Sequence, residues 1–112
     1  MPSIAEWCAK VHECALTHGW WDKEREFPEI VALLHSEVSE AFEECRLGWA
    51  VQRVYYHPVK GDKPLGVPIE LADIVIRVMD FCAHAGIDLE AAITAKHRYN
   101  LTRSYRHGGK LA

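Results

Sequence analysis

The segment from Pro68 to Gly86 constrains the possible fold more than any other part of this sequence. On a helical wheel its apolar side chains cover about 220° of the circumference, which indicates a helix that is buried on most sides. The remaining wedge carries charged residues, which are Glu70, Asp73, Arg77 and Asp80. Glu70 and Asp73 are three residues apart, so their carboxylates are neighbours on the wedge. Because unpaired charge beside apolar surface costs several kcal/mol, the pair needs a compensating cation, which Arg77 supplies only in part.

A second pair of carboxylates lies on the helix that the pattern predicts from Pro28 to Gly48. The apolar stripe of this helix is centred on Val38, and we expect the stripe to face the core. The stripe consists of Val31, Leu34, Val38, Ala41, Phe42 and Cys45. Glu37, Glu40 and Glu44 lie together beside it, about 100° to 160° from its centre, and Glu37 and Glu40 are three residues apart. For this helix alone, a solvated acidic face is the simpler interpretation.

The two pairs together predict a metal site. If the two helices face each other, four carboxylates can meet, namely Glu37, Glu40, Glu70 and Asp73. Mg²⁺ binds a few carboxylate oxygens and keeps waters or substrate phosphates as its other ligands. All-oxygen ligation favours Mg²⁺, with Mn²⁺ as a possible substitute, over iron or zinc. The sequence contains no Glu-x-x-His pair of a di-iron bundle, no HExxH, no Gly-rich phosphate loop and no G-x-S-x-G.

Four helices are expected along the chain. They run from Ser3 to about His18, from Pro28 to Gly48, from Pro68 to Gly86 and from Asp88 to about Thr102. Residues 49–67 are rich in Pro and Gly, which predicts a long loop or a short hairpin between the second and third helices. The pattern indicates one all-α domain, residues 1–112, folded as a four-helix bundle. A bundle this small has little core of its own, so we expect dimerisation to complete it.

Composition and charge limit the class of protein. The chain is 49% apolar and 26% charged, as is usual for soluble globular proteins. It has no apolar run of membrane-spanning length and no signal segment, so we expect a cytoplasmic protein without a membrane partner. Every acidic residue lies at or before Glu90, so the body is acidic, which argues against a nucleic-acid partner. The four cysteines, Cys8, Cys14, Cys45 and Cys82, fall in apolar stripes and are expected to be reduced core residues.

The C-terminal part of the chain is basic, with five Lys or Arg and no acid after position 90. Lys96, Asn100 and Arg103 are spaced by four and three residues and therefore share one helical face. We expect this face to bind the phosphates of a nucleotide. The alternative is a solvated basic tail that continues through Arg106 to Lys110.

Two adjacent tryptophans, Trp20 and Trp21, follow the first helix. Adjacent residues on a helix or strand point to different sides, so we expect one in the core and the other partly exposed. An exposed tryptophan beside a nucleotide site is a candidate stacking surface for the base. Simple packing is the alternative for both.

Two stretches together resemble a known family. They are LLHSEVSEA (33–41) and GVPIELADIVIR (66–77). Both are similar to the E-x-x-E … E-x-x-D signature of the MazG-like all-α nucleoside triphosphate pyrophosphohydrolases, and the similarity extends from about Pro28 to Lys110. Ser36 stands at a position where many members of that family carry Glu.

The resemblance implies a homodimeric or homotetrameric helical bundle that binds Mg²⁺. It implies hydrolysis of a nucleoside triphosphate to the monophosphate and pyrophosphate, in the house-cleaning of the nucleotide pool. It also implies that Glu37 or Glu40 orients the attacking water, while the four carboxylates named above hold the metal. Lys96 and Asn100 resemble the lysine and asparagine that family members place beside the phosphates and the sugar.

A protein-interaction module is the alternative function. In that case a non-catalytic helical dimer binds the basic surface of a partner through its acidic faces, with residues 49–67 as the contact element. The apolar surroundings of Glu70 and Asp73 argue against this alternative, because an acidic docking patch needs no such surroundings. Mg²⁺-dependent release of pyrophosphate distinguishes the two functions.

Overall fold

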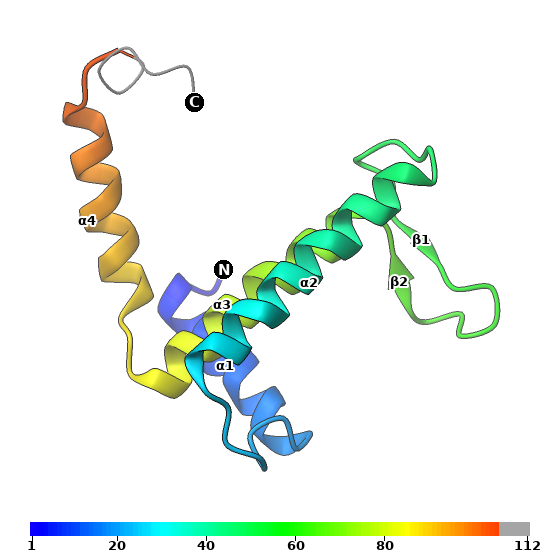
Figure 1. Cartoon of the computed structure of the whole chain (residues 1–112), viewed down its shortest axis with the longest axis horizontal. Helices are drawn as coiled ribbons and strands as arrows, with labels where there is room; N and C mark the ends of the chain where they lie inside the picture. The colour runs from blue at the N-terminus through cyan, green and yellow to red at the C-terminus, as the bar shows by residue number, and fades with distance from the viewer. Residues whose placement is uncertain (106–112) are drawn as a thin grey trace.

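The computed structural model describes residues 1–105, which form four helices and one small sheet (Figure 1). The helices are α1 (Ile4–Thr17), α2 (Phe27–Arg46), α3 (Val67–Ala85) and α4 (Leu89–Thr102). The strands β1 (Tyr55–Tyr56) and β2 (Pro64–Leu65) pair antiparallel, so the connection between α2 and α3 is a short hairpin. Arg106 and Lys110, which belong to the expected basic tail, lie outside the described residues. None of the helices in the described part of the chain is long and apolar enough to cross a bilayer.

Local sequence signals explain the helix boundaries. At the start of α1, Ser3 Oγ accepts the backbone N–H of Glu6 at 3.1 Å, and the Glu6 carboxylate accepts the N–H of Ser3 at 3.1 Å. At the start of α4, Asp88 Oδ1 accepts the N–H of Ala91 at 2.9 Å. Proline occupies the first turn of both α2 and α3, and Gly86 ends α3 in a left-handed conformation. The observed bounds therefore lie within about two residues of the predicted ones.

The core is small and lies where α3 packs against α2 and α1. Its buried apolar side chains are Cys8, Ile30, Val67, Met79 and Cys82. Cys8 and Cys82 are free thiols whose pKa is raised mainly by burial, as expected for core cysteines. Cys14 and Cys45 are also free but exposed, so the prediction of a core position is wrong for these two. Cys45 belongs to the apolar stripe of α2, which is not fully covered in the single chain.

The predicted core stripe of α2 is the clearest difference between expectation and structure. Val38 is 53% exposed and Phe42 is 61% exposed, whereas the neighbouring Glu37 is only 8% exposed. On α3, Leu71 and Val75 are likewise 51% and 48% exposed. Within one chain, α2 therefore turns its carboxylate flank toward α3 and leaves the centre of its apolar stripe uncovered.

The single chain does not enclose a complete core. It exposes 8449 Å² of surface, whereas a globular monomer of 12.8 kDa exposes about 6,300 Å². Its radius of gyration is 16.8 Å, compared with about 13 Å for a compact chain of this length. In residues 1–105 no side chain is less than 2% exposed. These values are those of an extended chain that leaves many of its large apolar side chains exposed.

Gly66, at the junction between the hairpin and α3, permits a close approach of two backbone segments. Its φ is 120°, and an added Cβ would overlap the carbonyl oxygen of Arg53. We expect Gly66→Ala to lower the free energy of unfolding by at least about 2 kcal/mol, because both the backbone strain and the overlap act against folding. Thermal unfolding followed by circular dichroism measures this loss. Gly61→Ala is the matched control, because an added Cβ there meets open space, and an equal loss in both variants would contradict the explanation.

Candidate metal centre and adjoining pocket

Three of the four predicted metal ligands converge between α2 and α3. One carboxylate oxygen from each of Glu37, Glu70 and Asp73 lies within 4.8 Å of the other two. The spacing of three residues places Glu70 and Asp73 on the side of α3 that faces α2. Glu40 is exposed and lies outside this group of three, although it lines the same pocket as Glu37 and Asp73.

The carboxylates of this group are not satisfied by the protein. Glu37 Oε1 accepts a hydrogen bond from Arg77 Nε at 2.7 Å. Glu37 Oε2 and Glu70 Oε2 are buried, and no donor within the described residues reaches either oxygen. A buried polar atom without a partner is costly unless a ligand completes it. Two buried, unpartnered carboxylate oxygens side by side therefore fit a hard divalent cation.

Burial and mutual repulsion raise the pKa of two of these carboxyl groups. The pKa of Glu70 lies above its ordinary value because of burial first, then the charge of Asp73 and, more weakly, that of Glu40. The pKa of Asp73 is also raised, by burial and then by Glu37, while Arg77 acts in the opposite direction. Without a cation, negative charge in this group thus opposes folding.

This repulsion predicts a pH dependence of stability for the metal-free chain. A carboxyl group whose pKa is raised by folding binds more protons in the folded chain than in the unfolded chain. The free energy of unfolding therefore falls as the pH rises from the ordinary pKa, 4.5 for Glu70 and 3.8 for Asp73, through the raised values. In EDTA, we expect the free energy of unfolding of Glu70→Gln to exceed that of the wild type by a margin that grows as the pH rises from acid to neutral. Thermal unfolding across this range measures the difference, and a difference that shrinks toward neutral pH would contradict the assignment.

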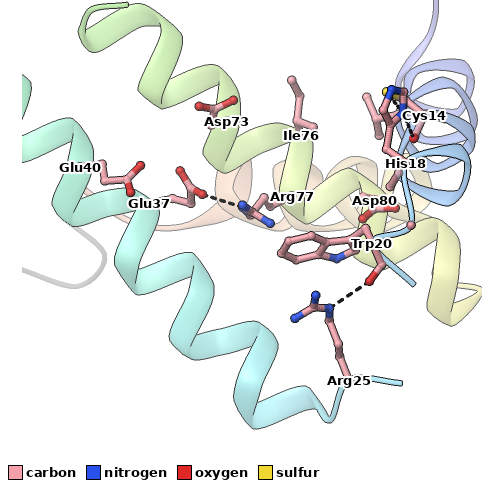
Figure 2. Close-up of a pocket in the computed structure, with 13 residues that line it drawn as sticks. Cys14, His18, Trp20, Arg25, Glu37, Glu40, Asp73, Ile76, Arg77 and Asp80 are labelled. Carbon is pink, nitrogen blue, oxygen red and sulfur yellow. Dashed lines mark hydrogen bonds and ion pairs between the residues drawn. The ribbon is translucent and has the colours of Figure 1, made fainter. Parts of the chain in front are cut away.

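A pocket of about 760 Å³ opens beside the carboxylates, between α1, α2 and α3 (Figure 2). Glu37, Glu40 and Asp73 lie at one end of the pocket. Trp20 and Arg25, from the segment between α1 and α2, lie at the other end, and Arg77 lies between the two ends. A volume of this size is typical of small-molecule sites.

Trp20 is held in this pocket by two arginines. The guanidinium carbon of Arg25 lies 3.9 Å from the centroid of the indole ring, and that of Arg77 lies 4.2 Å from it. Figure 2 shows the ring between the two guanidinium groups. Arg25 Nε also donates a hydrogen bond to the carbonyl oxygen of Trp20 at 3.2 Å. The sequence analysis did not identify Arg25, although a cation close to two tryptophans was a signal that could have indicated it.

Trp21 has a different environment from Trp20. Its Nε1 donates to both carboxylate oxygens of Asp80, at 3.0 and 3.1 Å, and its ring stacks on His84 with a centroid distance of 3.6 Å. His12 Nδ1 lies 2.7 Å from the same carboxylate. These contacts satisfy the buried Asp80 and fix the segment that carries Trp20. They favour packing for Trp21. The faces of the Trp20 ring are covered by Arg25 and Arg77, so the predicted stacking on a base requires one of these guanidinium groups to move.

The predicted phosphate-binding residues of α4 are not brought to the carboxylates within one chain. Lys96 and Asn100 line a separate, shallow hollow of about 400 Å³ on α4 itself. Arg103 lies 5.7 Å from the ring of Tyr99, also on α4. In Figure 1, α4 projects away from the paired α2 and α3. Within residues 1–105, Arg77 and Lys63 are the cations whose charges lower the pKa of Asp73, and Arg25 lies across the pocket.

Glu44 is a further carboxylate near the centre that the sequence analysis did not place in the site. Its Oε2 accepts the hydroxyl of Tyr55 from the hairpin at 2.7 Å, and its charge contributes to the raised pKa of Glu70. The same contact raises the pKa of the Tyr55 hydroxyl. The hairpin is thereby attached to the acidic side of the site.

Comparison of the chain with protein-family models, with curated proteins and with solved structures finds no match. The resemblance of residues 33–41 and 66–77 to the MazG-like signature accordingly stays a prediction from the sequence. The function is argued below from the carboxylate group and its pocket.

Proposed function

We propose that this chain is a Mg²⁺-dependent, MazG-like nucleoside triphosphate pyrophosphohydrolase of the cytoplasm. It would convert a nucleoside triphosphate to the monophosphate and pyrophosphate, as part of nucleotide-pool house-cleaning. The observation that carries the proposal is the group of three carboxylates, in which Glu37 and Glu70 each have one buried, unpartnered oxygen. Glu37 and Asp73 of this group line the end of the pocket, and Arg25, Arg77 and Trp20 are among the other residues that line it. Guanidinium groups and an indole ring suit phosphates and a base.

Glu37, Glu70 and Asp73 are the residues that would hold Mg²⁺, or Mn²⁺ in its place. When bound there, the cation supplies charge neutralisation for the phosphates and acidifies a bound water. One oxygen of Glu37 already accepts from Arg77, and the other is buried without a donor. Glu40 is exposed at the pocket wall, so we assign to Glu40 the task of orienting the attacking water and accepting its proton.

The cations of the pocket would bind the triphosphate. Arg77 contacts both Glu37 and the Trp20 ring, and is therefore fixed at the boundary between the carboxylates and the open part of the pocket. Arg25, held by the Trp20 carbonyl and by Glu29 at 3.6 Å, presents a second guanidinium to the same space. Planar guanidinium groups bind phosphate oxygens in pairs. The two guanidinium groups cover the faces of the Trp20 ring, so a base would stack on this ring only after one of them leaves it for the phosphates.

A homodimer, or a homotetramer built from it, completes the proposal. The uncovered faces of α2 and α3, which carry Val38, Phe42, Leu71 and Val75, form an apolar surface. Such a surface is typical of an interface between identical chains. The surface excess of the single chain, roughly 2,100 Å², is more than the roughly 800 Å² per partner that a standard interface buries.

The alternative, a non-catalytic module that binds a basic partner through its acidic faces, is less consistent with the site. The unpartnered oxygens of Glu37 and Glu70 are buried, so a partner's basic side chain cannot reach them from the surface. A small cation can occupy that position.

Pyrophosphate release from a panel of ribo- and deoxyribonucleoside triphosphates, with Mg²⁺ and with EDTA, tests the proposed function. We expect release with Mg²⁺ or Mn²⁺, none in EDTA, and a monophosphate as the second product. Glu37→Gln should lose this activity, while Glu13→Gln on the exposed surface of α1 should keep it. Release of single phosphates, or no release from any triphosphate, would contradict the proposal.

A further inference from the structure

Arg77 contacts the carboxylate group on one side and the tryptophan of the pocket on the other. Its Nε donates to Glu37 Oε1 at 2.7 Å, and its guanidinium carbon lies 4.2 Å from the centroid of the Trp20 ring. The side chain of Glu37 is 10% exposed and that of Arg77 is 32% exposed, so water screens this ion pair less than it screens a surface pair. Figure 2 shows Arg77 between Glu37 and Trp20.

Trp20 supports Arg77 from the side that faces away from the carboxylates. Arg25 lies on the opposite side of the same ring, with its guanidinium carbon 3.9 Å from the centroid (Figure 2). Arg25 Nε also donates to the carbonyl oxygen of Trp20 at 3.2 Å, which keeps the ring and Arg25 together. A guanidinium group over an indole ring is attracted by the ring. The contact with Trp20 therefore stabilises the position in which Arg77 pairs with Glu37.

A divalent cation would compete with Arg77 for the charge of Glu37. Arg77 binds Oε1 of this carboxylate, and Oε2 of the same carboxylate is buried without a donor. A cation on the carboxylate group would thus be close to the guanidinium group, and like charges repel strongly where water is scarce. The cation would also neutralise the carboxylates, which then need Arg77 less as a counter-ion. Cation binding and the pairing of Arg77 with Glu37 consequently oppose each other.

We propose that Arg77 couples cation binding to the opening of the pocket, because Mg²⁺ on the carboxylate group releases Arg77 from both Glu37 and Trp20. This inference rests on the proposed function and adds to it an order of binding, in which the cation binds before the triphosphate. Arg77 lies between the carboxylate end and the Trp20 end of the pocket, so the released guanidinium group can turn to the phosphates. Its departure also uncovers one side of the Trp20 ring for the base.

Calorimetric titration of the free protein with Mg²⁺ alone tests this coupling. Trp20→Leu removes the ring that supports Arg77 and leaves all the carboxylates in place. We expect this variant to bind Mg²⁺ about fivefold to a hundredfold more tightly than the wild type, because a contact that opposes cation binding is lost. A residue with a merely structural role would weaken Mg²⁺ binding when replaced, or leave it unchanged.

Two further variants separate the coupling from a general effect of charge. Arg25→Ala removes the group on the opposite side of the Trp20 ring and should also strengthen Mg²⁺ binding, since Trp20 then supports Arg77 less firmly. Lys23→Ala removes the same charge from an exposed position of the same segment and should leave the Mg²⁺ affinity unchanged. Circular dichroism shows whether each variant keeps its helices.

Intrinsic fluorescence of the wild type gives a second readout that needs no substrate. We expect Mg²⁺ alone to change the tryptophan emission, and Trp20→Phe to lose this change. An emission that Mg²⁺ leaves unchanged, or a Mg²⁺ affinity that neither Trp20→Leu nor Arg25→Ala raises, would overturn the inference. Pyrophosphate release by the wild type would show in that case that the proposed function stands. A wild type that binds no Mg²⁺ would overturn both.

Discussion

Glu70→Gln should lower Mg²⁺-dependent pyrophosphate release by at least about a hundredfold while the helical circular dichroism stays that of the wild type. Glu70 supplies one of the three converging carboxylates, and its Oε2 is one of the two buried oxygens without a donor. Glutamine has nearly the same shape as glutamate, but its neutral amide offers a metal ion only one weakly binding oxygen. Steady-state release of pyrophosphate, together with Mg²⁺ titration of the free protein, measures both consequences.

The thermal stability of the metal-free protein should rise, and not fall, when Glu70 is replaced by glutamine. The raised pKa of Glu70 reports repulsion from Asp73, Glu40 and Glu37 in addition to burial, and the neutral amide removes this repulsion. We therefore expect a higher Tm for Glu70→Gln than for the wild type in EDTA, and a reversed order in saturating Mg²⁺, which stabilises only the chain that binds it. Glu13→Gln, an exposed carboxylate of α1, should change neither activity nor Tm. Near wild-type activity of Glu70→Gln would show that this carboxylate is not a metal ligand.

The helices and their ends could be predicted from the sequence because they depend on local interactions. The box formed by Ser3 and Glu6, the cap at Asp88 and the stop at Gly86 each act within one turn of helix. The depth at which Glu37 is buried could not be predicted in the same way. The wheel placed Val38 at the centre of the core, whereas α3 packs against the flank of α2 that carries Glu37 and leaves Val38 53% exposed.

In the candidate site, too, the sequence predicts the positions that depend on helical spacing, and it does not predict those that depend on contacts between distant segments. A spacing of three residues is sufficient to place Glu70 and Asp73 together. Glu37 reaches them because α2 turns its carboxylate flank, and not the centre of its apolar stripe, toward α3. Arg25 was missed because its position depends on the turn between α1 and α2, which has no periodic pattern. The location of Lys96 relative to the carboxylates depends on the direction of α4, and the residues of α4 do not determine that direction when they contact so little of their own chain.

If the proposed dimer or tetramer forms through the apolar face of α2, Phe42→Asp should convert it to a monomer of 12.8 kDa at micromolar concentration. Phe42 is 61% exposed in the single chain, so an aspartate at this position leaves the packing of the monomer intact. In a two-fold interface both copies lose an apolar side chain worth about 1.5 to 3 kcal/mol, which weakens association at least about a hundredfold. Sedimentation velocity measures the change, and circular dichroism shows whether the monomer keeps its helices.

Ala32→Asp adds the same charge to an exposed position on another face of α2 and should leave the assembly unchanged. A Phe42→Asp protein that still sediments as the wild type does would place the interface elsewhere on the chain. Glu37, Glu70 and Asp73 belong to one chain, so the monomer should keep its affinity for Mg²⁺.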